Sequence, residues 1–294
     1  MKKDNKQPLV SVVMPVYNAG DFLVESVNSI LQQTYKNFEF IIVDDRSTDD
    51  SWIILGKLAA KDKRIRTYRL KKSAGVSETV KFAIAKTRGK FIARMDADDV
   101  SLPKRLELQV KYLLHNPKTV AVGGQCSIIN KEGELIGEKR FPIKNKDIYS
   151  YIFKFVPVQQ PTLMIAKTRL PKDFEYYHDG LNTAEEIELL FKLFQFGKVE
   201  NLKEIVLLYR LHENNTSLKN IKSTFFFTLL SRIKAILQYG YRPSVTGLLV
   251  TFIQLIAVSV LPQKTVFWLY EKSRKMLYSM KYSRIGLRPA GGIR

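Results

Sequence analysis

The first hundred residues alternate between short apolar runs and segments with helical spacing, and this alternation limits the folds that the chain can adopt. The apolar runs occupy residues 10–15, 38–43 and 91–95, and residues 65–70 are predicted as a further strand between them. Helical spacing lies between them, at residues 22–33, from about residue 49, and at residues 76–87. Buried strands that alternate with helices are typical of a parallel sheet covered by helices. The sequence therefore predicts an α/β fold.

The second half of the chain contains further strand and helix signals and then changes in composition. We expect helices at residues 106–114 and 185–196, and strands at residues 120–122, 127–129 and 206–211. Beyond residue 220 the sequence becomes aromatic, basic and helical in character. A chain of 294 residues can hold one large α/β domain and an appendage. We predict a domain at residues 1–218 and a helical region at residues 219–294.

The apolar run at residues 91–95 ends in three carboxylates, Asp96, Asp98 and Asp99. In open α/β sheets, ligands bind at the carboxyl ends of the strands. Several acids at that edge are unfavourable unless a cation lies near them, and a hard divalent cation prefers oxygen ligands and bridges to phosphates. The alternative is an acidic turn that caps a helix starting near Pro103. On this stretch alone, both interpretations stay open.

Other polar motifs stand where predicted elements begin or end. They are Pro15-Val16-Tyr17-Asn18, Val43-Asp44-Asp45-Arg46-Ser47-Thr48-Asp49, Glu185-Glu186 and Tyr209-Arg210-Leu211-His212. Together with Asp96-Ala97-Asp98-Asp99, and in this order over residues 9–218, they resemble the motifs of family 2 glycosyltransferases. The resemblance implies the GT-A fold, a Rossmann-like, mixed but mostly parallel sheet flanked by helices. Taken singly, the acids and Tyr17 could instead serve helix capping and packing.

The resemblance also implies an activity and a division of roles among these residues. The activity is the inverting, non-processive transfer of a sugar from a nucleotide-diphospho-sugar, most simply a UDP-sugar, with a divalent metal, Mn²⁺ or Mg²⁺. Metal ligands are expected at Asp98, with Asp96, Asp99 and His212. Donor-binding residues are expected at Pro15, Tyr17, Asp44, Asp45, Lys81, Asp96 and Arg210.

The general base is expected at Glu186, because a carboxylate at a helix N-terminus is stabilised as the anion. Glu185 remains a competitor, since the family motif has Asp at the second position and Glu reaches one methylene further. Two further departures concern the donor site: Arg46 stands where the family has Gly, and Lys81 follows Val80 where members often carry Arg-Asn. These departures leave the preferred donor open.

The charge is concentrated in the C-terminal region. The chain carries a formal charge of +20, and residues 219–294 contain 13 Lys and Arg but one acid, Glu271. Residues 243–263 have no charge, and 245–261 are almost wholly apolar with basic flanks on both sides. This pattern favours a helix lying in the membrane surface over nucleic-acid binding. A bilayer-spanning helix and a helix buried against the α/β domain are the alternatives.

The location and acceptor follow from the same features. A single cysteine and an N-terminus without an apolar signal segment indicate a cytoplasmic protein, held peripherally, or as a monotopic protein, on the inner face of the cell membrane. We expect the acceptor to be a lipid-linked glycan of cell-surface polysaccharide biosynthesis. The alternatives are an inactive glycan- or nucleotide-binding homologue and a sugar nucleotidyltransferase, although the latter needs a Gly-rich phosphate loop that is missing after the first strand.

Overall fold

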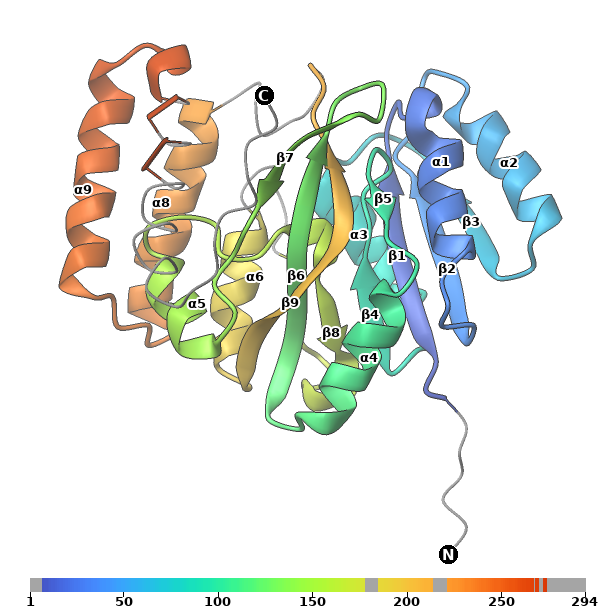
Figure 1. The fold of residues 1–294 in the computed structure, drawn as a ribbon, viewed down its shortest axis with the longest axis horizontal. Helices are drawn as coiled ribbons and strands as arrows, with labels where there is room; N and C mark the ends of the chain where they lie inside the picture. Colours follow the sequence, from blue (N-terminus) through green and yellow to red (C-terminus); the bar gives the residue numbers. More distant parts are fainter. Residues whose placement is uncertain (1–6, 178–184, 214–220, 267, 270–271, 274–294) are drawn as a thin grey trace, which may run out of the picture.

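The computed structural model describes residues 7–177, 185–213, 221–266, 268–269 and 272–273. Within them, a mixed sheet runs through the centre of the α/β part and helices cover both of its faces (Figure 1). The strand order is β3–β2–β1–β4–β8–β6–β9–β5, with β7 paired to β6. The predicted α/β class and the GT-A-like mixed sheet are therefore confirmed.

The N-terminal half forms the parallel part of the sheet. Its strands are β1 (Val10–Val16), β2 (Phe38–Asp44), β3 (Ile65–Arg69) and β4 (Phe91–Arg94), and its helices are α1 (Gly20–Leu31), α2 (Ser51–Lys61) and α3 (Val76–Ala85). Alternate residues of β1 serve different cores. Val12 packs in the cluster that includes α1 and α2, whereas Val13 packs in the cluster that includes α3. Both faces of the strand are thus buried, which explains its continuous apolar sequence.

The C-terminal half of the sheet is mixed. It contains β5 (Val100–Ser101), α4 (Arg105–His115), β6 (Thr119–Ile129), β7 (Leu135–Lys139), α5 (Asn145–Tyr151), β8 (Met164–Ala166), α6 (Glu185–Phe194) and β9 (Lys198–Arg210). β8 runs antiparallel to both β4 and β6, whereas β6 and β9 are parallel. The start of α6 and the end of β9, which carry two of the predicted motifs, therefore belong to this C-terminal half.

The expected break between two short strands near residue 124 is wrong, because β6 is one strand with irregular register there. The two glycines at this point of β6 are required by close packing. A Cβ on Gly123 would lie 2.3 Å from the Asn201 Oδ1 atom, and a Cβ on Gly124 would lie 2.5 Å from Val206. These glycines therefore allow the close approach of β9.

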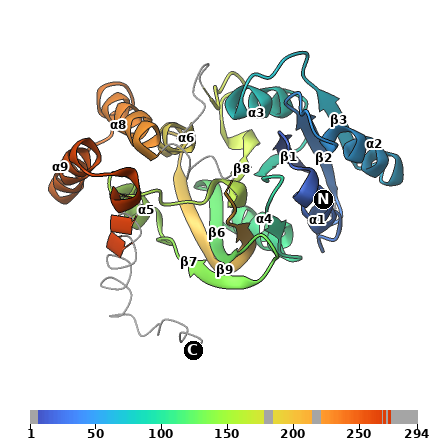
Figure 2. The ribbon, with the colours of Figure 1, turned by 90° about the horizontal axis from the view of Figure 1, so that it is seen from above.

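The helices α8 (Ile221–Gln238) and α9 (Val245–Val260) stand side by side at the end of the molecule opposite α2 (Figures 1 and 2). α8 packs on α6, and the buried carboxylate of Glu188 joins the two helices by accepting from the Lys234 Nζ atom and the Tyr239 hydroxyl, each at 2.7 Å. Within the described ranges, no helix combines the length and apolar character needed to cross a membrane.

Candidate active site

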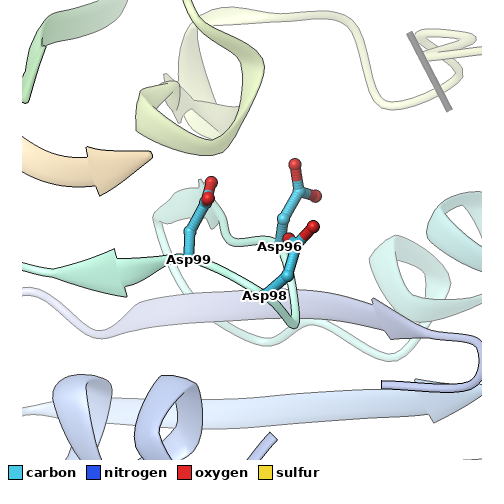
Figure 3. A group of neighbouring side chains, drawn as sticks. All are labelled: Asp96, Asp98 and Asp99. Carbon is cyan, nitrogen blue, oxygen red and sulfur yellow. The ribbon is translucent and has the colours of Figure 1, made fainter. Parts of the chain in front are cut away.

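Three carboxylates gather on the loop that follows β4. The parallel pairing of β4 with β1 carries this loop to the carboxyl edge of the sheet. Asp96, Asp98 and Asp99 project to the same side of the loop (Figure 3), and one oxygen of each lies within 4.8 Å of the others. The sequence-predicted acid cluster is thus assembled in space.

Asp99 is the most constrained of the three. Its side chain is fully buried; Oδ1 accepts a 2.9 Å hydrogen bond from the backbone N–H of Arg210, and Oδ2 has no hydrogen-bond partner among the residues that the structure describes. Burial, followed by the charges of Asp98 and Asp96, raises the pKa of Asp99 well above its ordinary value. A buried oxygen without a donor, beside two further carboxylates, has the chemistry of a hard cation site. These residues therefore fit a divalent metal.

An arginine and a histidine side chain contact the acid loop. The Arg94 guanidinium contacts the Asp96 carboxylate at 2.7 Å, and the His212 Nε2 atom lies 2.9 Å from Asp98 Oδ2. Burial raises the pKa of Asp96, with Asp98 adding to the effect, while the positive charge of Arg94 opposes it. The structure thus brings His212 to the predicted metal ligand Asp98.

Arg105 lies beside the end of β4, where the acid loop begins, and was not anticipated from the sequence. It is fully buried, and its Nη2 atom donates to the Arg94 carbonyl at 2.6 Å while its Nε atom donates to Gln109 at 3.2 Å. Burial lowers its pKa to about 10. Arg94 was missed as well; the available signal was an arginine inside an otherwise apolar strand, since a buried cation must have polar partners.

Arg210 connects several segments around the acid loop. Its side chain is 2% exposed and donates to the backbone carbonyls of Asp98 at 2.9 Å, Lys131 at 2.9 Å and Asn130 at 3.2 Å. Its Nη2 atom also pairs with Glu25 on α1. The predicted donor-binding arginine therefore holds the loop, the β6–β7 turn and α1 together.

A second group of predicted residues lies at the ends of β1 and β2. Asp44 is fully buried and pairs with the Arg69 Nε atom at 2.9 Å. Asp45 accepts hydrogen bonds from the backbone N–H groups of Ala74 at 2.7 Å and Gly75 at 2.9 Å. Asp44 thus has a structural ion pair, and Asp45 holds the loop before α3.

Tyr17, at the end of β1, is exposed, and Pro15 is partly buried beside it. The loop that follows Tyr17 is joined to the loop after β2, because the Asn18 side-chain oxygen accepts from the Thr48 backbone N–H at 2.8 Å. Arg46, which replaces the family's glycine, has a φ of +64°. The left-handed backbone explains why glycine is common at this position.

The remaining predicted residues, Lys81, Glu185 and Glu186, lie outside the two groups described above. Lys81 lies on α3 and pairs with Glu78 at 3.2 Å. Glu186 is partly buried in the first turn of α6, whereas the side chain of Glu185 lies outside the described residues. The catalytic assignment of either glutamate therefore stays a prediction.

Comparison with known proteins identifies the family. Residues 11–171, more than half of the chain, match "Glycosyl transferase family 2". The chain belongs to this glycosyltransferase family. An uncharacterized glycosyltransferase from Haemophilus influenzae is 32% identical over 218 residues, which cover 71% of this chain and 68% of the relative. The O-antigen biosynthesis glycosyltransferase WbnJ of Escherichia coli is 35% identical, covering 71% of this chain and 82% of WbnJ.

Solved structures confirm the fold of the family 2 enzyme. The Staphylococcus aureus TarS fragment 1–349 in complex with UDP-GlcNAc superimposes with a TM-score of 0.61 at 18% identity, over 79% of this chain and 68% of that fragment. The mannosyltransferase PcManGT from Pyrobaculum calidifontis, in complex with GDP-Man and Mn²⁺, superimposes with a TM-score of 0.57 at 15% identity, over 96% of this chain and 87% of PcManGT. The predicted membership in family 2 and the predicted enzyme class are thus confirmed.

Proposed function

We propose that this family 2 enzyme transfers a sugar from a UDP-sugar to a hydroxyl of a glycan, with inversion at the anomeric carbon. The observation that carries the proposal is the acid cluster, in which the buried Oδ2 atom of Asp99 has no donor within the described part of the chain while Asp96 and Asp98 lie beside it. Nucleotide-sugars are the ligands of TarS and PcManGT in the complexes named above, which supports this donor class.

Asp98, together with Asp96 or Asp99 and with His212, would hold Mn²⁺ or Mg²⁺. When bound, such an ion supplies Lewis-acid neutralisation of the diphosphate that leaves. The protein's own contribution is to fix the carboxylates in place, since Arg105 donates to the Arg94 carbonyl at the end of β4 and Arg210 donates to the Asp98 carbonyl within the loop. A rigid set of ligands lowers the reorganisation needed when the donor binds.

The nucleotide would lie near the ends of β1 and β2. The exposed ring of Tyr17 is available as a wall beside the base, with Pro15 behind it. Asp45 would accept a hydrogen bond from the pyrimidine ring while it also holds the loop before α3, because a carboxylate has more acceptor sites than the backbone N–H groups use. Asp44 and Lys81 would lie at the edge of this nucleotide-binding region.

Glu186 would serve as the general base. It would take the proton of the acceptor hydroxyl while the hydroxyl oxygen bonds to the anomeric carbon and the nucleotide diphosphate departs from the opposite side. Its position in the first turn of α6 supports this role, because the helix dipole stabilises the carboxylate anion there. Glu185 is the competing base.

The acceptor would be a lipid-linked glycan of cell-surface polysaccharide biosynthesis, and the enzyme would work peripherally at the cytoplasmic face of the membrane. The role of the relative WbnJ in O-antigen biosynthesis supports a glycan acceptor. The basic and apolar composition of residues 219–294 supports the location.

A panel of nucleotide-sugars, tested for binding and for hydrolysis with and without Mn²⁺, examines the whole proposal. We expect a UDP-sugar to bind and to be hydrolysed slowly only with metal. Asp98→Ala should abolish both metal-dependent effects, whereas Asp173→Ala, which alters an exposed acid, should leave them unchanged. Turnover by Asp98→Ala at the normal rate would contradict the metal assignment.

The base is tested separately. Glu186→Gln should abolish transfer while donor affinity stays nearly normal, and Glu185→Gln should retain transfer. Inactivity of Glu185→Gln alone would move the base by one residue. Donor binding without hydrolysis or transfer by the unaltered protein would instead indicate an inactive nucleotide-binding homologue.

A further inference from the structure

The helix α8 has its apolar face turned away from the protein. Phe226, Leu230, Ile233 and Leu237, spaced by three or four residues, form one exposed stripe. The opposite side, which faces the α/β domain, includes the buried Arg232. This distribution is the reverse of that in an ordinary surface helix, where the apolar stripe faces the core.

The helix α9 shows the same reversal. Gly247, Thr251 and Gln254 lie along the side that packs on the protein: Thr251 donates to the Phe153 carbonyl at 2.8 Å, and Gln254 donates to the Lys154 carbonyl at 2.7 Å. Phe252 and Ile253 are exposed on the other side. Small and polar side chains thus anchor the helix, and its large apolar side chains remain in contact with solvent.

Both helices are held in this orientation by polar contacts. The buried Arg232 donates to Thr251 at 3.2 Å and to Gln254 at 3.1 Å, so it joins the inward faces of α8 and α9. Turning either helix by half a turn would bury the apolar stripe but would also break these bonds and expose their partners. The outward apolar surface is therefore a fixed feature of the packing.

The charges around this surface indicate what covers it. Arg242 precedes α9 and Lys264 follows it, and both are exposed, so α9 has a cation at each end. In the sequence, residues 219–294 hold 13 basic residues against one acid. A second copy of the chain would bring two strongly positive regions together, whereas an anionic lipid surface would attract them.

We propose that the exposed faces of α8 and α9 form a docking surface for an anionic phospholipid bilayer, with both helices lying in the plane of the interface. The apolar side chains enter the boundary between headgroups and acyl chains, and Arg242 and Lys264 meet the lipid phosphates at the two ends of α9. This inference adds a specific membrane contact to the proposed function. It depends on the proposed function only for the lipid-linked acceptor.

Co-sedimentation of the full chain with vesicles tests the docking surface. We expect binding to vesicles that contain phosphatidylglycerol and much weaker binding to phosphatidylcholine alone, with the difference reduced by salt. The double variant Phe252→Glu, Ile253→Glu should bind roughly a hundredfold more weakly, since each insertion contributes on the order of tenfold. The matched control is Ile53→Glu on α2, because Ile53 is 57% exposed and Ile253 is 56% exposed.

The outcomes separate the possible occupants. Loss of vesicle binding in the double variant but not in Ile53→Glu supports the proposal. Equal binding by all three proteins overturns it, and so does a wild-type protein that binds no vesicles. Self-association that the double variant abolishes, in place of vesicle binding, would assign the surface to a second copy.

Donor hydrolysis without vesicles distinguishes this inference from the proposed function. The double variant should hydrolyse the donor at the wild-type rate, because α9 lies well apart from β4, which the acid loop follows (Figures 1 and 2), and both altered side chains are exposed. A wild-type protein that binds anionic vesicles but neither binds nor hydrolyses any nucleotide-sugar would refute the proposed function and leave the docking surface standing.

Discussion

Replacing Arg210 by Met should destabilise the protein in the absence of any donor or metal. The methionine side chain has a similar length and no charge, so the change mainly removes hydrogen bonds. Arg210 donates to the carbonyls of Asp98, Asn130 and Lys131 and pairs with Glu25. The variant would leave these three carbonyl groups without their charged donor.

The magnitude follows from these contacts. A hydrogen bond with a charged partner contributes about 1.5–3 kcal/mol, so three of them at the lower end give about 4–5 kcal/mol. The desolvation cost of burying the guanidinium is relieved in the variant, which offsets part of the loss. The pair with Glu25 adds little, because the Glu25 side chain is 57% exposed. We expect the free energy of unfolding to fall by about 3 kcal/mol.

Urea denaturation of the metal-free, donor-free protein measures this loss. Arg210→Lys should fall between wild type and Arg210→Met, because lysine keeps the charge but not the planar arrangement of donors. Arg88→Met is the control, since the mostly exposed Arg88 side chain pairs with Glu39 alone and should contribute at most about 1 kcal/mol. Unchanged stability of Arg210→Met together with a raised KM for the donor would refute the positioning role and assign Arg210 to the diphosphate.

Three further predictions concern neighbouring residues. Because the pKa of Asp99 is raised, the folded protein retains a proton that the unfolded chain has already released. The free energy of unfolding should therefore fall as the pH rises from the ordinary aspartate pKa through the raised one. Urea titrations should show that Asp99→Asn removes this loss. His212→Gln should weaken Mn²⁺ binding by about 10–100-fold in calorimetry, and an unchanged affinity would exclude His212 from the metal set. Arg46→Gly should raise the free energy of unfolding by about 0.5–1 kcal/mol, because it removes left-handed strain at φ +64°; a decrease in the urea midpoint would contradict this.

The sequence was sufficient for the parallel half of the fold. β1 and β2 are largely apolar runs, and each is followed by a helix with clear periodicity, so local signals and final structure agree there. The mixed half was harder to predict. β5 has two residues and β8 has three, too short for any periodicity, and both exist because longer neighbours offer them hydrogen bonds. The sequence predicted two short strands within β6, whereas Gly123 and Gly124 continue one strand and allow the approach of β9.

The acids of the candidate site were predictable from the sequence, but the arginines that hold them in place were not. Asp96, Asp98 and Asp99 are close in sequence, so their proximity in space required only that the preceding strand be buried. The contacts of Arg210 with residue 98, with the turn at residues 130–131 and with Glu25 span between 79 and 185 residues of sequence. No local pattern encodes such separations. The role of Arg105 at the end of β4 was hidden for the same reason.

The way in which these arginines are used explains how the acid loop can be rigid and still attract a cation. Arg105 and Arg210 hold the loop mainly through backbone carbonyls, and Arg210 reaches Asp99 through its backbone N–H. A guanidinium paired directly with Asp99 would have lowered the pKa of that carboxyl and neutralised it. Instead burial and the two neighbouring acids raise the pKa of Asp99, so the folded loop holds a proton that an ordinary aspartate would release. A divalent ion would take the place of that proton, so metal binding should release it and should tighten as the pH rises.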